Sequence, residues 1–380
     1  MEGSVIFMKQ AARNKEYDLW WAMSAEAGIR SVQLCNKAGG SESLFLMDKG
    51  ELLDLGVSEK GAEHIIYRRK TWDYEKQRRI LLEEGIRFVP WYDRQYPKRL
   101  LQASGYPFAL FVKGELPDET APAVALIGAR ECSEYGRLCA EYFGRELAAC
   151  GVNVISGMAI GIDGITQQSA LAAGGKSYAV LGCGPDICYP PANRNLYGLL
   201  AGNGGLISEY GPRVKAVAWH FPARNRIIAG LSDVVIVVEA KAKSGTLITA
   251  DMALDAGREV LVVPGRITDP MSVGCMNLWK TGASPAMCVE DVLDVLAENK
   301  KMQTCDVGKQ TAVLDEEPEQ ALESEEKLVY SCVDLYARST EDILERTGLS
   351  YQDLLRILTE LEFKGLIRET GRGYYVRATG

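Results

Sequence analysis

Six short loops rich in glycine and small residues recur between residues 124 and 265, and each follows an apolar, β-branched run. The loops are Gly128-Ala129-Arg130, residues 156–164, residues 182–186, Ser208-Glu209, residues 239–245 and Pro264-Gly265. Backbone N–H groups of such loops, and of helices that begin after them, bind anions, most often phosphate. In an open parallel sheet all such loops leave at one edge, where α/β proteins bind ligands. The sequence therefore predicts a phosphate-binding edge.

Cationic and hydroxyl side chains accompany the loops. Arg130 lies in the first loop, and we expect Lys176 near the same edge, where it would act on a phosphate as a point charge. Ser244-Gly245-Thr246 places hydroxyl and amide donors at a predicted helix start, which is typical of an anion cradle.

The segment Phe221-Pro222-Ala223-Arg224-Asn225-Arg226 is the most distinctive basic element of the chain. Pro222 suits the first turn of a helix. Arg224 and Arg226 are two residues apart on that helix, so they point to different sides. We expect one of them to reach a ligand, and the other to brace a loop or to pair with Glu209 or Glu239.

The spacing of the glycines argues against two common phosphate ligands. A dinucleotide fold needs G-x-G-x-x-G at the start of its first helix, whereas the second loop has glycines at positions 157, 161 and 164. Gly174-Gly175-Lys176-Ser177 resembles the end of a P-loop, but Ala170 replaces the required first glycine and a predicted strand follows the lysine. We therefore expect neither NAD binding nor NTP hydrolysis, and no cofactor.

No catalytic or metal-binding set is evident in these loops. The chain has two histidines, His64 and His220, and ten cysteines without a CxxC pair, which argues against a zinc site and a disulfide framework. Four acidic residues at strand ends are expected to orient arginines or cap helices: Asp163, Asp186, Glu209 and Glu239. Many phosphate donors without a nucleophile or metal cluster favour binding over turnover.

Length and composition set the outer limits. The 380 residues suffice for two or three domains, and 47% of them are hydrophobic. No apolar run reaches the ~18 residues of a membrane span, and no signal-peptide pattern is present, so we expect a cytoplasmic protein. The net charge of −8 disfavours nucleic acid at first sight, but residues 315–326 alone hold seven acidic residues. Such a run is typical of a solvated linker, so the net charge says little about the loops.

Patterning along the chain predicts five segments: 1–85, 86–120, 121–298, 299–324 and 325–380. The first is helical, and its residues 55–62 form either a helix–hairpin–helix turn or an ordinary helix–loop–helix. A connector and then alternating strand and helix patterns follow, which predict a parallel, doubly wound α/β sheet. After the acidic linker, the order helix, helix, hairpin is that of a winged helix.

The charge of the predicted winged helix argues against reading of duplex DNA. Residues 325–380 carry eight Lys/Arg and ten Asp/Glu. The expected recognition helix sets three acids against two bases: Asp353, Glu360 and Glu362 against Arg356 and Lys364. Major-groove binding is therefore doubtful, and a protein-contact or regulatory role is an equal alternative.

Taken in order, these segments resemble the DprA/Smf family of DNA-processing proteins over nearly the whole chain. The residues that carry the resemblance are Val124-Ala125-Leu126-Ile127-Gly128-Ala129-Arg130, Ser156-Gly157, Gly161-Ile162-Asp163, Ala179-Val180-Leu181-Gly182-Cys183-Gly184, Tyr189-Pro190, Ser208-Glu209, Phe221-Pro222-Ala223-Arg224-Asn225-Arg226, Val238-Glu239-Ala240, Ser244-Gly245-Thr246-Leu247 and Val263-Pro264-Gly265. Each is weak alone, whereas the ordered set is highly specific.

The resemblance implies an N-terminal helical domain like a sterile alpha motif, an extended Rossmann domain and a C-terminal winged helix. It implies a non-enzymatic protein that binds and protects single-stranded DNA, dimerises through the Rossmann domain and loads RecA during natural transformation. The family's DNA-binding arginine and lysine correspond to Arg130 and Lys176. We expect DNA contacts from Gly128, Arg130, Ser156, Gly157, Gly161, Lys176, Gly182, Arg224, Asn225, Arg226, Ser244, Gly245 and Thr246, with stacking on Tyr189 or Phe221.

The chain departs from the family at two positions. Ile160 stands where an arginine is frequent, and Gln167 where a histidine is frequent. Two alternative functions stay open beside DNA binding. One is a nucleotide-processing Rossmann enzyme similar to phosphoribohydrolases, whose Pro-Gly-Gly loop is missing before Ser244. The other is a winged-helix regulator with a ligand-sensing Rossmann core.

Overall fold

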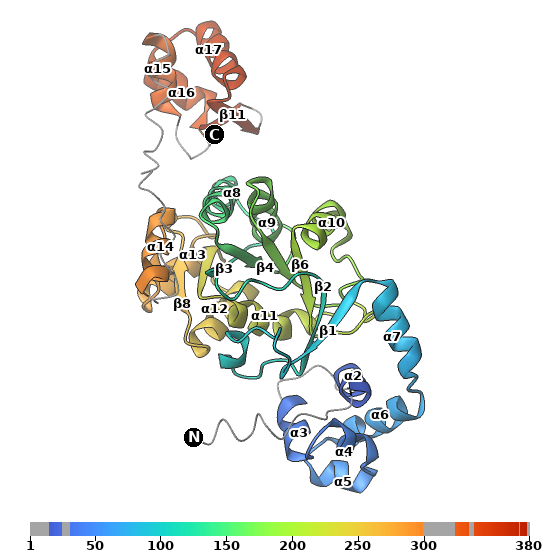
Figure 1. Cartoon of the computed structure of the whole chain (residues 1–380). Coiled ribbons are helices and arrows are strands. Elements are labelled where there is room, and N and C mark those ends of the chain that lie inside the picture. Colours follow the sequence, from blue (N-terminus) through green and yellow to red (C-terminus); the bar gives the residue numbers. More distant parts are fainter. Residues whose placement is uncertain (1–14, 25–30, 299–323, 334–337, 372, 378–380) are drawn as a thin grey trace.

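The computed structural model describes residues 15–24, 31–298, 324–333, 338–371 and 373–377 (Figure 1). Its N-terminal part is helical, as predicted. The helices are α2 (Lys15–Ser24), α3 (Ser31–Lys37), α4 (Ser41–Leu46), α5 (Lys49–Asp54), α6 (Glu59–Lys70) and α7 (Tyr74–Glu83). Helices α2 to α6 pack around the buried Trp20 and Trp21, whereas α7 packs through Leu81 against Ile86 and Phe111 of the first two strands. Gly56, at a φ of +94°, makes the turn between α5 and α6, and Ser58 then caps α6 by accepting a hydrogen bond from the N–H of Gly61.

A nine-stranded sheet with the order β1-β2-β6-β5-β4-β3-β7-β8-β9 forms the centre of the molecule. Seven strands run parallel, which confirms the predicted α/β fold: β3 (Ala123–Gly128), β4 (Asn153–Ser156), β5 (Ser177–Val180), β6 (Gly204–Ser208), β7 (Val234–Glu239), β8 (Glu259–Val262) and β9 (Ser284–Pro285). The connector contributes the other two, β1 (Ile86–Pro90) and β2 (Ala109–Gly114), and β2 pairs antiparallel with β6. The sheet is therefore mixed rather than wholly parallel.

Helices cover both faces of this sheet (Figure 1). One face carries α8 (Glu134–Ala149), α9 (Ile162–Ala172), α10 (Arg194–Gly202) and α14 (Val289–Glu298), and the other carries α11 (His220–Leu231), α12 (Gly245–Asp255) and α13 (Val273–Lys280). Successive side chains of β3 are buried on opposite faces of the sheet. Val124 and Leu126 belong to the hydrophobic core on the face covered by α8, and Ala125 and Ile127 belong to the core on the face covered by α11. Burial on both faces explains the continuous apolar runs of these strands.

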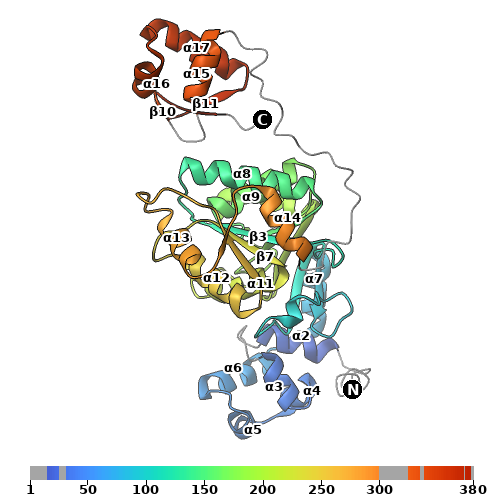
Figure 2. The ribbon, with the colours of Figure 1, turned by 90° about the vertical axis from the view of Figure 1, so that its left-hand side faces the viewer.

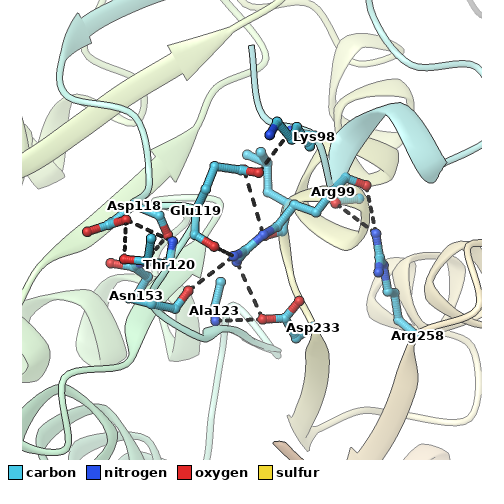
Figure 3. Close-up of polar contacts among 12 residues, drawn as sticks. Lys98, Arg99, Asp118, Glu119, Thr120, Ala123, Asn153, Asp233 and Arg258 are labelled. Atoms are coloured by element: carbon cyan, nitrogen blue, oxygen red, sulfur yellow. Dashed lines mark hydrogen bonds and ion pairs between the residues drawn. The ribbon is translucent and has the colours of Figure 1, made fainter. Parts of the chain in front are cut away.

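A buried charge cluster fixes the connector to the amino ends of β3 and β7 (Figure 3). The Asp233 carboxylate accepts a hydrogen bond from the N–H of Ala123 at 3.0 Å and lies 3.4 Å from the Arg99 guanidinium. Arg99, which precedes the short 3-10 helix η1 (Leu100–Gln102), also donates to the carbonyl of Ala121 at 3.1 Å. Its own carbonyl accepts from Arg258 at 2.7 Å. The buried polar groups at this edge of the sheet thus bind one another.

The C-terminal part has the predicted winged-helix elements. They are α15 (Ser324–Cys332), α16 (Thr340–Thr347), α17 (Tyr351–Phe363), β11 (Ile367–Gly371) and β12 (Tyr374–Arg377), with a short β10 (Arg338–Ser339) that pairs with β12. Ser339 and Ser350 cap α16 and α17 through their side-chain oxygens. The last two acids of the run predicted to be a linker, Glu325 and Glu326, lie in helix α15. No helix among the described residues has the length and apolar character needed to cross a membrane.

Candidate functional site

A cavity of about 540 Å³ opens at the carboxyl ends of β3, β4 and β7. The loops after these strands line it together with the first residues of α11 and α12. Predicted contact residues in its lining are Gly128, Arg130, Arg224, Asn225, Ser244, Gly245 and Thr246. Ala159, Asp163, Tyr189, Phe221, Ile248 and Thr249 also line it. Loops far apart in sequence therefore meet at one edge, as the parallel order predicts.

Four predicted residues lie beside the cavity rather than in its lining: Ser156, Gly157, Gly161 and Gly182. Ser156 is fully buried and its hydroxyl donates to the carbonyl of Leu126 at 2.6 Å. Gly161 has a φ of +83°, and a Cβ there would lie 2.3 Å from the carbonyl oxygen of Ala129. These residues fix the backbone of the loops from which the lining residues reach the cavity.

Arg224 forms the floor of the cavity. Its side chain is 5% exposed, donates to the carbonyl of Gly157 at 2.9 Å and contacts that of Val180. A Cβ on Gly157 would lie 2.5 Å from the guanidinium, so only glycine leaves room for it. Burial raises the pKa of the nearby Asp163 carboxyl, while the charge of Arg224 opposes that rise. Arg224 thus places a largely desolvated positive charge under the loops.

Arg226 faces away from the cavity, which confirms the prediction that the two arginines diverge and that one of them pairs with a glutamate. Its guanidinium binds both oxygens of Glu209, at 2.7 and 2.6 Å, and its Nε donates to the carbonyl of Gly105 at 2.8 Å. Burial alone lowers the pKa of Arg226, but the bond and charge of Glu209 outweigh it and raise that pKa. Arg226 braces the connector and is not placed to meet a ligand.

Glu239, the other proposed partner, caps α8 instead. Its carboxylate accepts hydrogen bonds from the N–H of Ser133, at 2.9 Å, and from the hydroxyl of the same residue. Burial raises the pKa of Glu239 above its ordinary value. Ser133 in turn accepts from the N–H of Gly136 and begins the helix. This carboxylate therefore holds the loop that carries Arg130.

The rim of the cavity combines a cation with aromatic rings. Arg130 is exposed, and its guanidinium carbon lies 5.8 Å from the ring centre of Phe221. The Tyr189 ring, 45% exposed, lies 5.4 Å from Phe221. The start of α12 adds hydroxyl groups to the opening. The hydroxyl of Thr246 donates to the carbonyl of Gly128 at 3.2 Å, and the hydroxyl of Ser244 accepts from the N–H of Thr246. Charge, flat rings and hydroxyl groups thus share one opening.

The expectation that Lys176 lies near this edge is wrong. Lys176 precedes β5, so it lies at the amino end of a parallel strand, whereas the cavity lies at the carboxyl ends. Its Nζ pairs with Glu115 at 2.6 Å on the opposite side of the sheet. Gln167 is also remote from the cavity lining, since it is fully buried and donates to the carbonyl of Tyr178 at 3.0 Å. Ile160 is 53% exposed and follows the lining residue Ala159.

Sequence reasoning missed further cations on this edge. Lys215 and Lys243 are both exposed and each adjoins a lining residue, Ala216 and Ser244 respectively. Lys241 is exposed in the same loop as Lys243. Their position after β6 and β7 was a usable signal, because residues that follow a parallel strand lie at its carboxyl edge.

The chain is similar in sequence to known proteins. A family model described as DNA recombination-mediator protein A matches residues 87–297, and one described as DprA winged helix domain matches residues 314–371. The DNA processing protein DprA of Bacillus subtilis is 37% identical over 235 residues, which cover 61% of this chain and 79% of that protein. Protein Smf of Synechocystis is 30% identical over 396 residues, 96% of this chain and 100% of that protein.

Two solved structures share the fold with detectable sequence identity. The X-ray structure of DNA processing protein A from Streptococcus pneumoniae has a TM-score of 0.63 and 32% identity, and covers 74% of this chain and 98% of that one. The Helicobacter pylori protein, described for its single-stranded DNA binding mode, has a TM-score of 0.50 and 28% identity, with coverages of 56% and 96%. Since the recombination-mediator model matches more than half of the residues, the chain belongs to the DprA/Smf family of DNA recombination-mediator proteins.

Proposed function

We propose that this protein binds single-stranded DNA at the cavity on the carboxyl edge of the sheet. The observation that carries the proposal is the exposed guanidinium of Arg130 beside the Phe221 ring, at the mouth of a cavity lined by Ser244 and Thr246. Single-strand binders combine a positive groove for phosphates with rings on which bases stack. Lys215, Lys241 and Lys243 extend positive charge along the same edge.

The shape of the site favours a single strand over a duplex. A base stacks on Tyr189 or Phe221 only when its face is free, and duplex DNA keeps its base faces stacked internally. The cavity volume of about 540 Å³ lies in the range that holds a small molecule, which suits one nucleotide of a longer chain. The description of the Helicobacter pylori relative names single-stranded DNA as its ligand, and this supports the same ligand here.

We infer a binding protein rather than an enzyme, and a mediator role in the cytoplasm. The family description, recombination mediator, supports a protein that protects single-stranded DNA and loads RecA on it during DNA uptake. Within the described residues, the carboxylates nearest the site already have partners. Asp163 accepts from the N–H of Gly157, and Glu239 holds Ser133. Release of free base from AMP would instead favour the nucleotide-processing alternative.

The Rossmann domain also offers a surface for the proposed homodimer. A second hollow of about 460 Å³ is lined by Ile267, Met276 and Trp279, of which Ile267 is 91% and Trp279 is 44% exposed. Exposed apolar side chains that cluster in this way are typical of protein–protein contacts. We propose that a second copy of the chain covers this hollow.

Binding of fluorescent oligo-dT to the full chain, measured by anisotropy across a salt series, tests the DNA site. Arg130→Ala should weaken binding about tenfold, because a charge-assisted contact of ~1.5 kcal/mol is lost. The log–log salt slope should fall by about 0.7 for each phosphate contact removed. Lys176→Ala is the matched control, since it removes the same charge at the opposite edge and should leave binding unchanged.

Two outcomes would contradict the site. If Lys176→Ala weakens binding as much as Arg130→Ala, the strand lies elsewhere or follows both edges. If a duplex of the same length binds as tightly as oligo-dT at moderate salt, stacking on the rim does not select a single strand.

A further inference from the structure

The β11–β12 hairpin, the wing of the C-terminal domain, lies on the side of that domain that faces α8 (Figure 2), and a side chain of β11 reaches α8. Arg368, on β11, lies 2.5 Å from a carboxylate oxygen of Glu134 and 3.9 Å from one of Glu141. These two glutamates are seven residues apart, so they lie on the same face of α8. All three side chains are about one third exposed, at 36%, 29% and 30% respectively. One arginine thus bridges two acids of another domain.

The remaining surface of the winged helix is poorly suited to a duplex. In winged-helix and related folds the recognition helix enters the major groove, and here that helix is α17. Its Arg356 pairs with Glu360 at 3.0 Å and with Glu325 at 3.6 Å. Lys364, directly after α17, pairs with Glu326 at 2.5 Å. Both of these bases are therefore balanced by acids of their own domain, whereas Arg368 on β11 pairs with acids of another domain.

We propose that the surface of α8 that carries Glu134 and Glu141 is a docking surface for the wing of the same chain; Glu134 also pairs with Arg137 of its own helix at 3.4 Å, and its second oxygen receives Arg368. A surface ion pair is weak between separate molecules. Here both partners belong to one chain, so the contact is intramolecular and is favoured by the resulting effective concentration. The winged helix is then a protein-contact module held on its own core.

The place of this contact relates it to the cavity. Glu134 is the first residue of α8, and Ser133, its N-cap, lies three residues after Arg130. The docked domain therefore lies beside the loop that carries Arg130, although it contributes no residue to the cavity lining. The contact needs no DNA, so it stands or fails independently of the proposed function.

Small-angle X-ray scattering of the full chain without DNA tests the docking. Arg368→Glu, and separately Glu134→Gln combined with Glu141→Gln, should raise the radius of gyration toward the value that the wild type reaches in 1 M salt. Loss of one surface ion pair shifts the docked-to-free ratio by roughly fivefold, and added salt acts in the same direction because the Debye length falls to about 3 Å. Arg346→Glu is the matched control: Arg346 is an exposed arginine of the same domain, and its substitution should change nothing.

Three results would overturn the proposal. The first is a radius of gyration that is equal in wild type and Arg368→Glu and insensitive to salt. The second is an equal increase in Arg346→Glu, which would point to net charge rather than to this contact. The third is compaction that disappears on dilution, which would show docking on another copy. Circular dichroism melting of each variant checks that the domains stay folded.

Discussion

The buried pair between Arg226 and Glu209 predicts a large stability loss when one partner is changed. Glu209→Gln keeps the shape of the side chain but removes its charge, so an amide N–H₂ can face the guanidinium. The Arg226 and Glu209 side chains are 6% and 3% exposed, and two contacts of 2.6–2.7 Å join them. Removing one partner of a buried pair costs about 3–5 kcal/mol, because the other charge stays buried.

The lower end of this range applies here. Arg226 keeps neutral acceptors, since its Nε still donates to the carbonyl of Gly105 at 2.8 Å and another guanidinium nitrogen contacts the carbonyl of Ala223. We therefore expect about 3 kcal/mol. For a domain the size of the one between residues 87 and 297, this corresponds to a melting temperature roughly 6–12 °C lower.

Differential scanning fluorimetry and urea unfolding, followed by tryptophan fluorescence, measure this loss. The matched comparison is the double variant Glu209→Leu, Arg226→Met, which removes both charges and should lose less than Glu209→Gln alone. A loss below about 1 kcal/mol for Glu209→Gln would refute the reasoning, because that is the range of an exposed ion pair. A double variant less stable than the single one would also refute it, since the buried charge would then not be the cause.

Two further predictions concern pH and assembly. Burial lowers the pKa of His220, whose ring stacks on Tyr210 at a centroid distance of 3.8 Å, so the unfolded state binds the proton more tightly than the folded state. The free energy of unfolding should therefore fall as the pH falls through about 6.5. His220→Gln should flatten that part of the profile of melting temperature against pH, and an unchanged profile would exclude His220 as the cause. Ile267→Asp should abolish a dimer in sedimentation velocity without lowering the melting temperature, because the side chain is 91% exposed, while a dimer that persists would exclude this hollow as the interface.

The candidate site was largely predictable where a local rule fixes position. Residues after parallel strands share one edge, so Gly128, Arg130 and Ser244 were expected at the same edge once a parallel sheet was predicted. Serine caps are local signals of the same kind, since the side chains of Ser339 and Ser350 cap the starts of α16 and α17. Spacing also predicted that Arg224 and Arg226 diverge, but it did not say which one faces the cavity. That choice depends on Glu209 and Gly105, both distant in sequence.

The predicted position of Lys176 was wrong because closeness in sequence to a glycine-rich loop was taken for closeness in space. The lysine lies before β5, and the glycine loop it was grouped with lies after the same strand. At about 3.3 Å per residue, four strand residues separate the two ends by roughly 13 Å and place them on opposite edges of the sheet. The strands of the connector were missed for a different reason. β1 and β2 are short strands between turns at one end of the sheet, where β2 pairs with β6 and β1 pairs with β2.

The two edges of the sheet differ in what the protein itself does with their polar groups, and this is the strongest reason to place a ligand at the carboxyl edge. At the amino edge Asp233 accepts from a backbone N–H and forms an ion pair with Arg99 (Figure 3). Lys176 pairs with Glu115 at the same edge. At the carboxyl edge the fixed groups, Arg224 and Glu239, bind backbone and hydroxyl groups and hold the loops still. Arg130 is left exposed above them on a fixed loop. A cation held ready by buried neighbours loses little freedom when a phosphate arrives, and this favours binding there.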